Sequence, residues 1–279
     1  MLNFVVLTLA LSTPVILAAM GGLASERAGV INIGLEGLML TSACVVATAS
    51  SSWGAGWGLL AGIIAAVVLS LVHWIATQFY RIDHVISGMA VNALALGGTN
   101  YLFGRFSESV GSADMPHFDY RAYIVFGLLV PFLAALYLSK FRGGLWLLAV
   151  GNDPDKARLA GLNPVKIRLA GLTVTGVLTG IAGAMLVSYT GVFTNEMTAG
   201  RGYIALAALI LGGWRPLPAF GGCLAFGLLS AIRLQFQGET VWGIQPPSQL
   251  WASLPYLATV LALAGFVGKL RTPSGLGKY

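Results

Sequence analysis

The chain has 279 residues, of which 57% are hydrophobic and only 9% are charged, and its mean hydropathy is +0.81. Soluble domains carry about a quarter charged residues, so this composition excludes a soluble protein and predicts a polytopic membrane protein. A helical span needs about 20 apolar residues, which leaves room for about nine spans, or about eight to ten, and short loops. An ATPase or receptor domain does not fit. The net charge of +6 does not indicate nucleic acid, because the basic residues lie in short loops, where positive charge sets topology.

Nine apolar runs predict an all-α bundle that forms a single domain over residues 1–279. The first run contains Pro14 as an expected kink, and it lacks a basic start and a small-residue cleavage site, so we expect a retained span. Gly21–Gly29 is expected to be a loop, and residues 105–120 an acidic loop. The runs are 3–20, 28–50, 57–79, 85–104, 122–139, 169–189, 203–213, 219–234 and 250–267.

A polar segment, Gly151–Arg168, interrupts the apolar pattern. Asp153 followed by Pro154 predicts a helix start, because the carboxylate accepts first-turn N–H groups and proline at the first position gives up no hydrogen bond. Gly161 predicts the stop, since it adopts the left-handed conformation without steric cost, and Asn163 repeats the start signal. The result is a short helix, a turn and a new helix. Such a short helix is unstable alone in water, so we expect it to dock against a cytoplasmic partner.

The run after this segment is rich in small residues. Gly176, Gly180 and Ala184 recur every four positions on one helical face. This spacing lets helix backbones approach closely in a membrane. We therefore expect a tight helix contact there.

Loop charge predicts the orientation of the chain. Residues 140–168 carry six Lys or Arg, and the end of the chain carries three more, whereas residues 106–120 and 235–249 carry none. Basic loops face the cytoplasm. Counting back through nine spans places the N-terminus outside and the C-terminus in the cytoplasm.

A weak internal echo links two apolar segments. The strings GVINIGLEGLML from Gly29 and GYIALAALIL from Gly202 share a glycine, a following apolar pair and a final apolar triplet. The predicted topology gives them opposite orientations. Inverted repeats with broken helices are a transporter architecture, so the echo favours a transporter.

Glu36 is the only acidic residue clearly inside a predicted span, and Asn32 is expected four residues earlier on the same helical face. An ionisable group in hydrocarbon usually faces a cavity or a partner. Glu36 and Asn32 are therefore candidates for a translocation path. The alternative is that Glu36 accepts hydrogen bonds from neighbouring helices or backbone and holds a broken segment in place.

Asn92 and Asn100 lie on the Gly-rich fourth run and are also candidates for the path. The alternative is that they only form hydrogen bonds between helices. Trp214–Pro218, with the sequence WRPLP, predicts a sharp break, either functional or a simple tight turn.

Enzyme chemistry finds no support in the sequence. Motifs for a nucleophile elbow, a zinc protease or a phosphate loop are missing, so no cofactor or metal is expected. The three histidines, His73, His84 and His117, lie in separate segments and are interpreted as incidental. Cys44 and Cys223 lie inside apolar runs and predict buried thiols.

Two segments carry a family resemblance. SERAGVINIGLEGLML (Ser25–Leu40) and AVGNDPDKARLAGLNPVKI (Ala149–Ile167) resemble the permease subunits of bacterial ABC importers that take up branched-chain amino acids, simple sugars and nucleosides. The resemblance covers nearly the whole chain. The form N-I-G-x-E-G at Asn32–Gly37 is most similar to the nucleoside and simple-sugar branch.

The resemblance implies the role of the polar segment and the partners of the chain. Residues 140–168 would hold a cytoplasmic coupling loop that seats in the ATPase, although Asp155-Lys156-Ala157 departs from the E-A-A form of the usual motif. It also implies a second permease subunit, cytoplasmic ATP-binding subunits, an extracytoplasmic substrate-binding protein and lipid of the bacterial inner membrane. The coupling candidates are Asp153, Asp155, Lys156, Ala157, Arg158 and Gly161.

The expected function is import of a neutral polar solute, with ATP hydrolysed by another chain. No Arg or Lys cluster within the spans could neutralise a phosphate or carboxylate, and the resemblance favours nucleosides, with simple sugars next. Two alternatives stay open at this point. One is an ion-coupled secondary transporter that uses Glu36, and the other is a structural membrane subunit without a path.

Overall fold

A computed structural model describes residues 2–110, 116–237 and 272–278, together with residues 249–251, 253–254, 257–258, 260 and 264. The regular structure of these residues is helical, which confirms the all-α prediction. The helices are α1 (Leu2–Arg27), α2 (Leu35–Trp53), α3 (Ala55–Gln78), α4 (His84–Val110), α5 (Tyr120–Lys140), α6 (Arg142–Asn152), α7 (Pro154–Leu159), α8 (Pro164–Thr190), α9 (Arg201–Leu211) and α10 (Pro216–Phe236).

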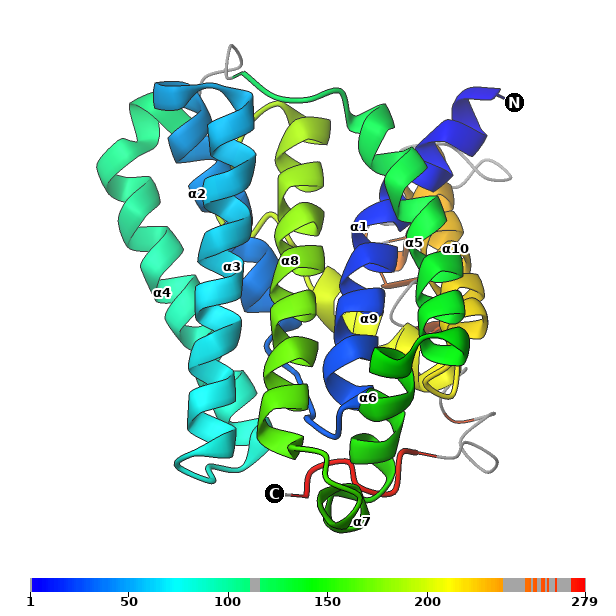
Figure 1. Cartoon of the computed structure of the whole chain (residues 1–279). Coiled ribbons are helices and arrows are strands. Elements are labelled where there is room, and N and C mark those ends of the chain that lie inside the picture. Colours follow the sequence, from blue (N-terminus) through cyan, green and yellow to red (C-terminus); the bar gives the residue numbers. More distant parts are fainter. Residues whose placement is uncertain are drawn as a thin grey trace.

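Helix α8 stands in the centre of the bundle, with α2, α3 and α4 on one side and α1, α5 and α10 on the other (Figure 1). The contacts of α8 are polar as well as apolar. The hydroxyls of Ser42 and Ser70 donate to the carbonyls of Gly180 and Leu172 at 2.6 and 2.8 Å, and that of Thr175 donates to Gly21 at 2.7 Å. Hydroxyl-to-carbonyl bonds of this kind hold helices together where water cannot compete.

Small residues bring α8 close to α3, as the sequence predicted. A Cβ added at Gly176 would lie 2.6 Å from the Cα of Val67, and one at Gly180 would lie 2.9 Å from the Cα of Ile63. Ala184 is fully buried. The backbones are therefore in contact, and a larger side chain at either glycine would force the helices apart.

The bundle has the surface of a membrane protein. Five described helices, α1, α3, α5, α8 and α10, are long and apolar enough to cross a membrane. The outer faces of α3 and α5 expose large apolar side chains, among them Ile64, Val68, Leu129 and Phe132. The count of nine spans stays a prediction, because much of the run 250–267 and of the segment 235–249 lies outside the described residues.

Two loop predictions were wrong. Gly21–Gly29 was expected to be a loop, but α1 continues to Arg27 because Gly21 serves close packing, with a would-be Cβ 3.2 Å from the carbonyl oxygen of Thr175. Residues 105–110 were expected in an acidic loop, but α4 extends to Val110. Within the expected coupling segment 140–168, α6 folds back onto α5, and Gly144 permits this because a Cβ there would collide with the Tyr137 carbonyl.

Two segments turn back into the bundle between helices. Residues 28–34 follow α1 and residues 191–200 follow α8, and each leads to a helix that begins about halfway along the bundle (Figure 1). These helices are α2 and α9, and they run in opposite directions. The break predicted at Trp214–Pro218 is confirmed, since α9 ends at Leu211, α10 begins at Pro216, and Trp214 between them has φ 55°.

The two cysteines are buried thiols, as the sequence predicted. Cys44 and Cys223 are free and buried.

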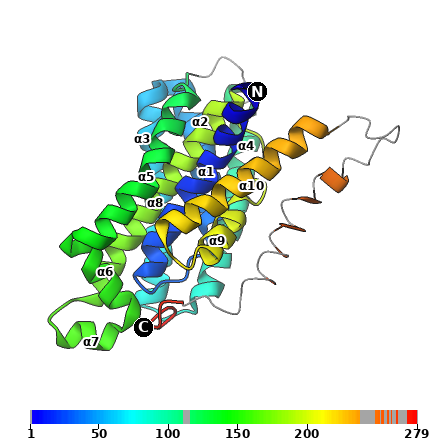
Figure 2. The same cartoon turned by 90° about the vertical axis from the view of Figure 1, so that its right-hand side faces the viewer.

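Helices α6 and α7 stand at one end of the bundle with residues 272–278, and α1 begins at the opposite end (Figure 2). The polar segment and the end of the chain therefore share one face.

The glycine contact predicts a stability difference. Gly176→Ala should lower the melting temperature in detergent, because overpacking against a backbone costs about 1–3 kcal/mol. Gly97→Ala is the matched control, since a Cβ there meets nothing within 4 Å of this chain. Fluorescence-detected thermal unfolding of the two variants measures the effect. Equal melting temperatures would contradict the close contact of α3 and α8.

Candidate functional site

The carboxylate of Glu36 joins the starts of α2 and α9. Its Oε1 accepts the backbone N–H of Gly200 at 2.7 Å, and its Oε2 accepts that of Gly202 at 2.6 Å. The first N–H groups of a helix have no partner within the helix, and the helix dipole favours a negative charge there. Glu36 thus supplies to α9 the cap that its own sequence lacks.

Glycine at position 202 makes this contact possible. A Cβ there would lie 2.5 Å from the backbone nitrogen of Glu36. The two helix starts therefore touch backbone to backbone. The echo between the segments at Gly29 and Gly202 has a spatial counterpart in this meeting of α2 and α9, while an inverted repeat stays a prediction.

Asn92 ties α4 to the same junction. Its Oδ1 accepts the backbone N–H of Gly37 at 2.8 Å, and its Nδ2 donates to the carbonyl of Ile33 at 3.0 Å and to the hydroxyl of Tyr203 at 2.9 Å. Three elements, the 28–34 segment with α2, α4 and α9, are thereby held together by one amide. The hydrogen bonds between helices that were one interpretation of Asn92 are present.

A cavity of about 280 Å³ opens at this junction, with several polar side chains in a largely apolar lining. Asn92 and Glu36 both line it, so the path interpretation and the bonding interpretation apply to the same side chains. Glu196, Thr198 and Tyr203 complete its polar lining. The sequence analysis missed these three residues, because nothing local marks the 194–200 segment as facing Glu36.

The backbone of this lining segment is unusual. Glu196 and Ala199 have φ values of 57° and 45°, in the left-handed region that residues with a Cβ rarely adopt. Such conformations persist only where surrounding contacts impose them, and they gather at functional sites. The bond from Gly200 to Glu36 is one such contact.

The other path candidates lie elsewhere. Asn32 was expected on one helical face with Glu36, which was wrong, because α2 begins only at Leu35 and Asn32 lies in the preceding segment. It is 1% exposed, and its Oδ1 accepts the N–H of Gly34 at 3.0 Å. Asn100 is exposed on α4 beside Tyr101 and Arg105 and is not brought to the cavity.

A second carboxylate holds the far end of α9. Trp214, just after α9, donates its indole N–H to Glu26 of α1, which is buried. The guanidinium Nε of Arg27 donates to the carbonyl of Trp214 at 2.8 Å. Helix α9 is therefore fixed at its start by Glu36 and beyond its end by Glu26.

His73 and His84 form hydrogen bonds to the backbone of the 28–34 segment. Their interpretation as incidental residues was therefore wrong, because they stabilise the fold. The ring of His73 bonds the carbonyl of Ile31 at 3.0 Å and the hydroxyl of Ser87 at 2.8 Å. The N–H of Ile31 donates to Nδ1 of His84 at 3.2 Å. His73 on α3 therefore bonds the carbonyl of Ile31, and His84 on α4 bonds its N–H.

The predicted short helix is present as α7. Asp153 Oδ1 accepts the N–H of Lys156 at 3.0 Å, and Gly161 has φ +83°. Asn163 caps α8 in the same way, accepting the N–H of Lys166 at 3.2 Å. The backbone N–H of Lys156, and then its ammonium, hold the pKa of Asp153 below its usual range. The cap is thus complete at neutral pH and is lost only as the pH falls through that lowered pKa.

The coupling candidates on α7 differ in their exposure to solvent. Asp155 pairs with Arg158 at 3.3 Å, and Lys156 pairs with Asp153 at 3.1 Å, all near solvent. Ala157 is only 4% exposed and packs inward, so it supports the helix and offers no contact surface. Leu159, which the sequence analysis did not single out, is 89% exposed. An apolar side chain so exposed on a charged helix suits a protein contact.

Broken helices that meet at a cavity in the middle of a membrane bundle are typical of membrane transport proteins. The family model described as "Branched-chain amino acid transport system / permease component" matches residues 4–267. The chain belongs to this family of permeases. Membership confirms the expected class, a transport subunit that is not an enzyme.

The chain is also similar to individual permeases. It is 32% identical to the guanosine ABC transporter permease protein NupQ of Bacillus subtilis, over 97% of this chain and 93% of that one. It is 33% identical to the nucleoside ABC transporter permease protein NupC of Lactococcus lactis, over 95% and 92%. A second B. subtilis guanosine permease protein, NupP, is 27% identical over 80% and 70%.

A solved structure has the same fold. It is an inward-facing conformation of a metal-chelate type ABC transporter, with a TM-score of 0.53 over 93% of this chain and 84% of that one. The sequence identity is 14%, so the likeness concerns the fold alone.

Removal of the Glu36 carboxylate should weaken the fold around α9. Glu36→Ala is expected to lower stability by about 2–4 kcal/mol, because two charge-assisted bonds to buried backbone are lost. Glu196→Ala is the matched control, since this carboxylate lines the same cavity but is exposed. Thermal unfolding in detergent compares the two. A loss of stability in Glu196→Ala as large as in Glu36→Ala would show that cavity charge matters and anchoring does not.

Proposed function

We propose that this chain is the membrane-spanning subunit of an ATP-driven nucleoside importer. The observation that carries the proposal is similarity over nearly the full length to permease proteins whose names specify guanosine and nucleosides. The cavity at the junction of α2, α4 and α9, with Glu36, Asn92 and Tyr203 in its lining, would supply a place for such a solute to pass.

The chemistry of the cavity favours a neutral solute. Two carboxylates, Glu36 and Glu196, line it, and none of its described lining residues is Lys or Arg. A nucleotide would bring its phosphate against these carboxylates without a compensating cation. A nucleoside or a simple sugar instead offers hydroxyl groups that can donate to carboxylates and pair with the Tyr203 hydroxyl.

Glu36 and Asn92 would line the translocation path, whereas Asn100 lies away from this cavity. Asn32 would act indirectly by shaping the 28–34 segment. A route of this kind need bind its solute only weakly, because an external receptor captures the solute first. The affinity of the importer would then reside in the receptor.

The partners follow from the two ends of the bundle. α7 would seat in a cytoplasmic ATPase through Asp155, Lys156, Arg158 and Leu159, with Asp153 and Gly161 fixing its length. The basic residues of 140–168 favour a cytoplasmic location for this end, and α1 would then begin outside a bacterial inner membrane. One α7 in each chain favours a pair of permeases, and the two guanosine permeases of B. subtilis favour a pair of different ones.

Uptake measurements test the function. A strain that carries only this system should accumulate labelled guanosine and uridine, should lose uptake on ATP depletion, and should keep it when an uncoupler collapses the proton gradient. Uptake that survives ATP depletion and fails with the uncoupler would contradict the proposal and indicate a secondary transporter. Accumulation of ribose without nucleosides would assign the sugar branch.

The end of α7 yields a prediction about coupling. Gly161→Val should reduce uptake about tenfold, because a β-branched residue at φ +83° strains the turn that ends α7. Asp153→Asn is the matched control, since asparagine caps a helix as well as aspartate does. Uptake and ATPase stimulation are measured in the assembled complex. Normal transport by Gly161→Val would remove α7 from the coupling surface.

A further inference from the structure

Residues 272–278, the tail segment, lie against the base of the bundle beside α7 (Figure 1). We propose that the tail segment and Arg168 are positioning elements that transmit movement of α7 to the 28–34 segment, and so to Glu36 at the cavity. This inference rests on the proposed function, because it assumes that an ATPase acts on α7. Sequence reasoning assigned the basic end of the chain only to topology.

The tail segment bridges two other segments through backbone hydrogen bonds. The N–H of Gly275 donates to the carbonyl of Gly151, near the end of α6, at 2.9 Å. The N–H of Gly277 donates to the carbonyl of Gly29, just after α1, at 2.9 Å. The tail segment thus links the base of α7 to the first turn of the 28–34 segment.

The packing at this link leaves no free space. A Cβ added at Gly275 would lie 2.9 Å from the Gly151 oxygen and 3.0 Å from Cδ of Pro154, the first residue of α7. A Cβ at Gly151 would collide with the carbonyl of Arg27. Three backbones are therefore in direct contact, and a displacement of α7 cannot leave the other two unmoved.

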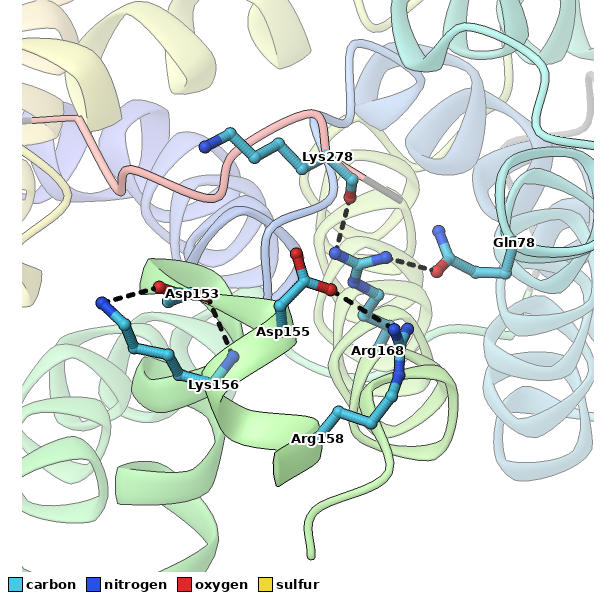
Figure 3. A network of polar contacts seen from close by, with 7 residues as sticks. All are labelled: Gln78, Asp153, Asp155, Lys156, Arg158, Arg168 and Lys278. Carbon is cyan, nitrogen blue, oxygen red and sulfur yellow. Dashed lines mark hydrogen bonds and ion pairs between the residues drawn. The ribbon is translucent and has the colours of Figure 1, made fainter. Parts of the chain in front are cut away.

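Arg168 connects the tail segment to the ends of α1 and α3 by hydrogen bonds. It is 1% exposed, and its guanidinium donates to the carbonyl of Ala28 at 3.3 Å. The guanidinium also donates to the carbonyl of Lys278 at 2.6 Å and to Oε1 of Gln78 at 2.7 Å (Figure 3). Arg168 was counted among the loop charges that set topology, but it is buried in the junction. Among the described residues Arg168 forms no ion pair, and the acceptors of its guanidinium there are carbonyl oxygens. A buried cation held in this way tolerates little displacement of its acceptors.

The 28–34 segment carries the displacement to the cavity. It is short, and Ile31 in its middle is held by the His73 and His84 rings. It ends at Gly34, α2 begins at Leu35, and the next residue is Glu36. Gly29 and Glu36 are thus connected through six residues of held backbone, 30–35, and a shift at the tail segment reaches the cap of α9.

The test separates coupling from folding. Arg168→Gln and Gly275→Ala are compared with Ser274→Ala, which changes an exposed side chain in the same segment. The complex with its ATPase and receptor is reconstituted in liposomes with guanosine as the probe. The two junction variants should assemble and keep basal ATPase activity, while receptor-stimulated ATPase and uptake fall about tenfold. Arg168→Lys should recover only part of this loss, since one ammonium cannot replace a three-donor fork.

A double variant tests whether the two positions act through one link. Arg168→Gln with Gly275→Ala should reduce stimulation no more than the stronger single change, because both break the same connection. Independent, multiplying losses would overturn the proposal, and so would normal stimulation in both single variants. If Arg168→Gln fails to assemble, Gly275→Ala and Arg168→Lys decide by the same criteria. Loss of stimulation in Gly161→Val with no loss in the junction variants would overturn this inference and leave the proposed function intact.

Discussion

The fold depends on satisfying the backbone of helices that begin inside the bundle. A helix start exposes N–H groups that cannot remain without partners away from water. The Glu36 carboxylate meets this requirement for α9 with two bonds of 2.7 and 2.6 Å. The same contact fixes the distance between α2 and α9, and the cavity lies beside it. The shape of the candidate path is therefore a consequence of how one carboxylate completes a broken helix.

Several buried groups have the same purpose. Asn92 satisfies the backbone of Gly37 and Ile33, while His73 and His84 satisfy that of Ile31. Each fixes part of the irregular chain that precedes α2. Glu26 holds Trp214, three residues beyond the end of α9, so this helix is constrained on both sides and is expected to move as a unit with α1 and α2. A transporter with such a core changes shape by small displacements of packed segments more readily than by local unfolding.

Local signals in the sequence predicted the features that need only neighbouring residues. Asp153, Gly161 and Asn163 lie where the short helix and its turn require them, because caps and left-handed turns depend on a few adjacent positions. The small residues of α8 were recognised for the same reason, since their spacing is local even though their contact is not. The apolar runs also located most of the helices.

Features that depend on distant parts of the chain escaped the sequence. The glycines at 21 and 22 suggested a loop, but Gly21 serves a helix contact that only the fold reveals. Nothing near Arg168 marks it as buried, because its acceptors come from three other segments. Glu36 was identified as exceptional from its place in an apolar run, but its bonding partners, the N–H groups of Gly200 and Gly202, lie more than 160 residues away and could not be predicted.

Hydrogen exchange at the start of α9 is the most direct measurement of the central claim. Exchange of peptides that cover residues 198–204 would be compared between the unmodified protein and Glu36→Gln, in which one oxygen acceptor becomes a donor. If the carboxylate holds the start of α9, these amides exchange much faster in Glu36→Gln and at the original rate in Glu196→Gln. Unchanged protection in Glu36→Gln would contradict the claim that this carboxylate joins the two broken helices.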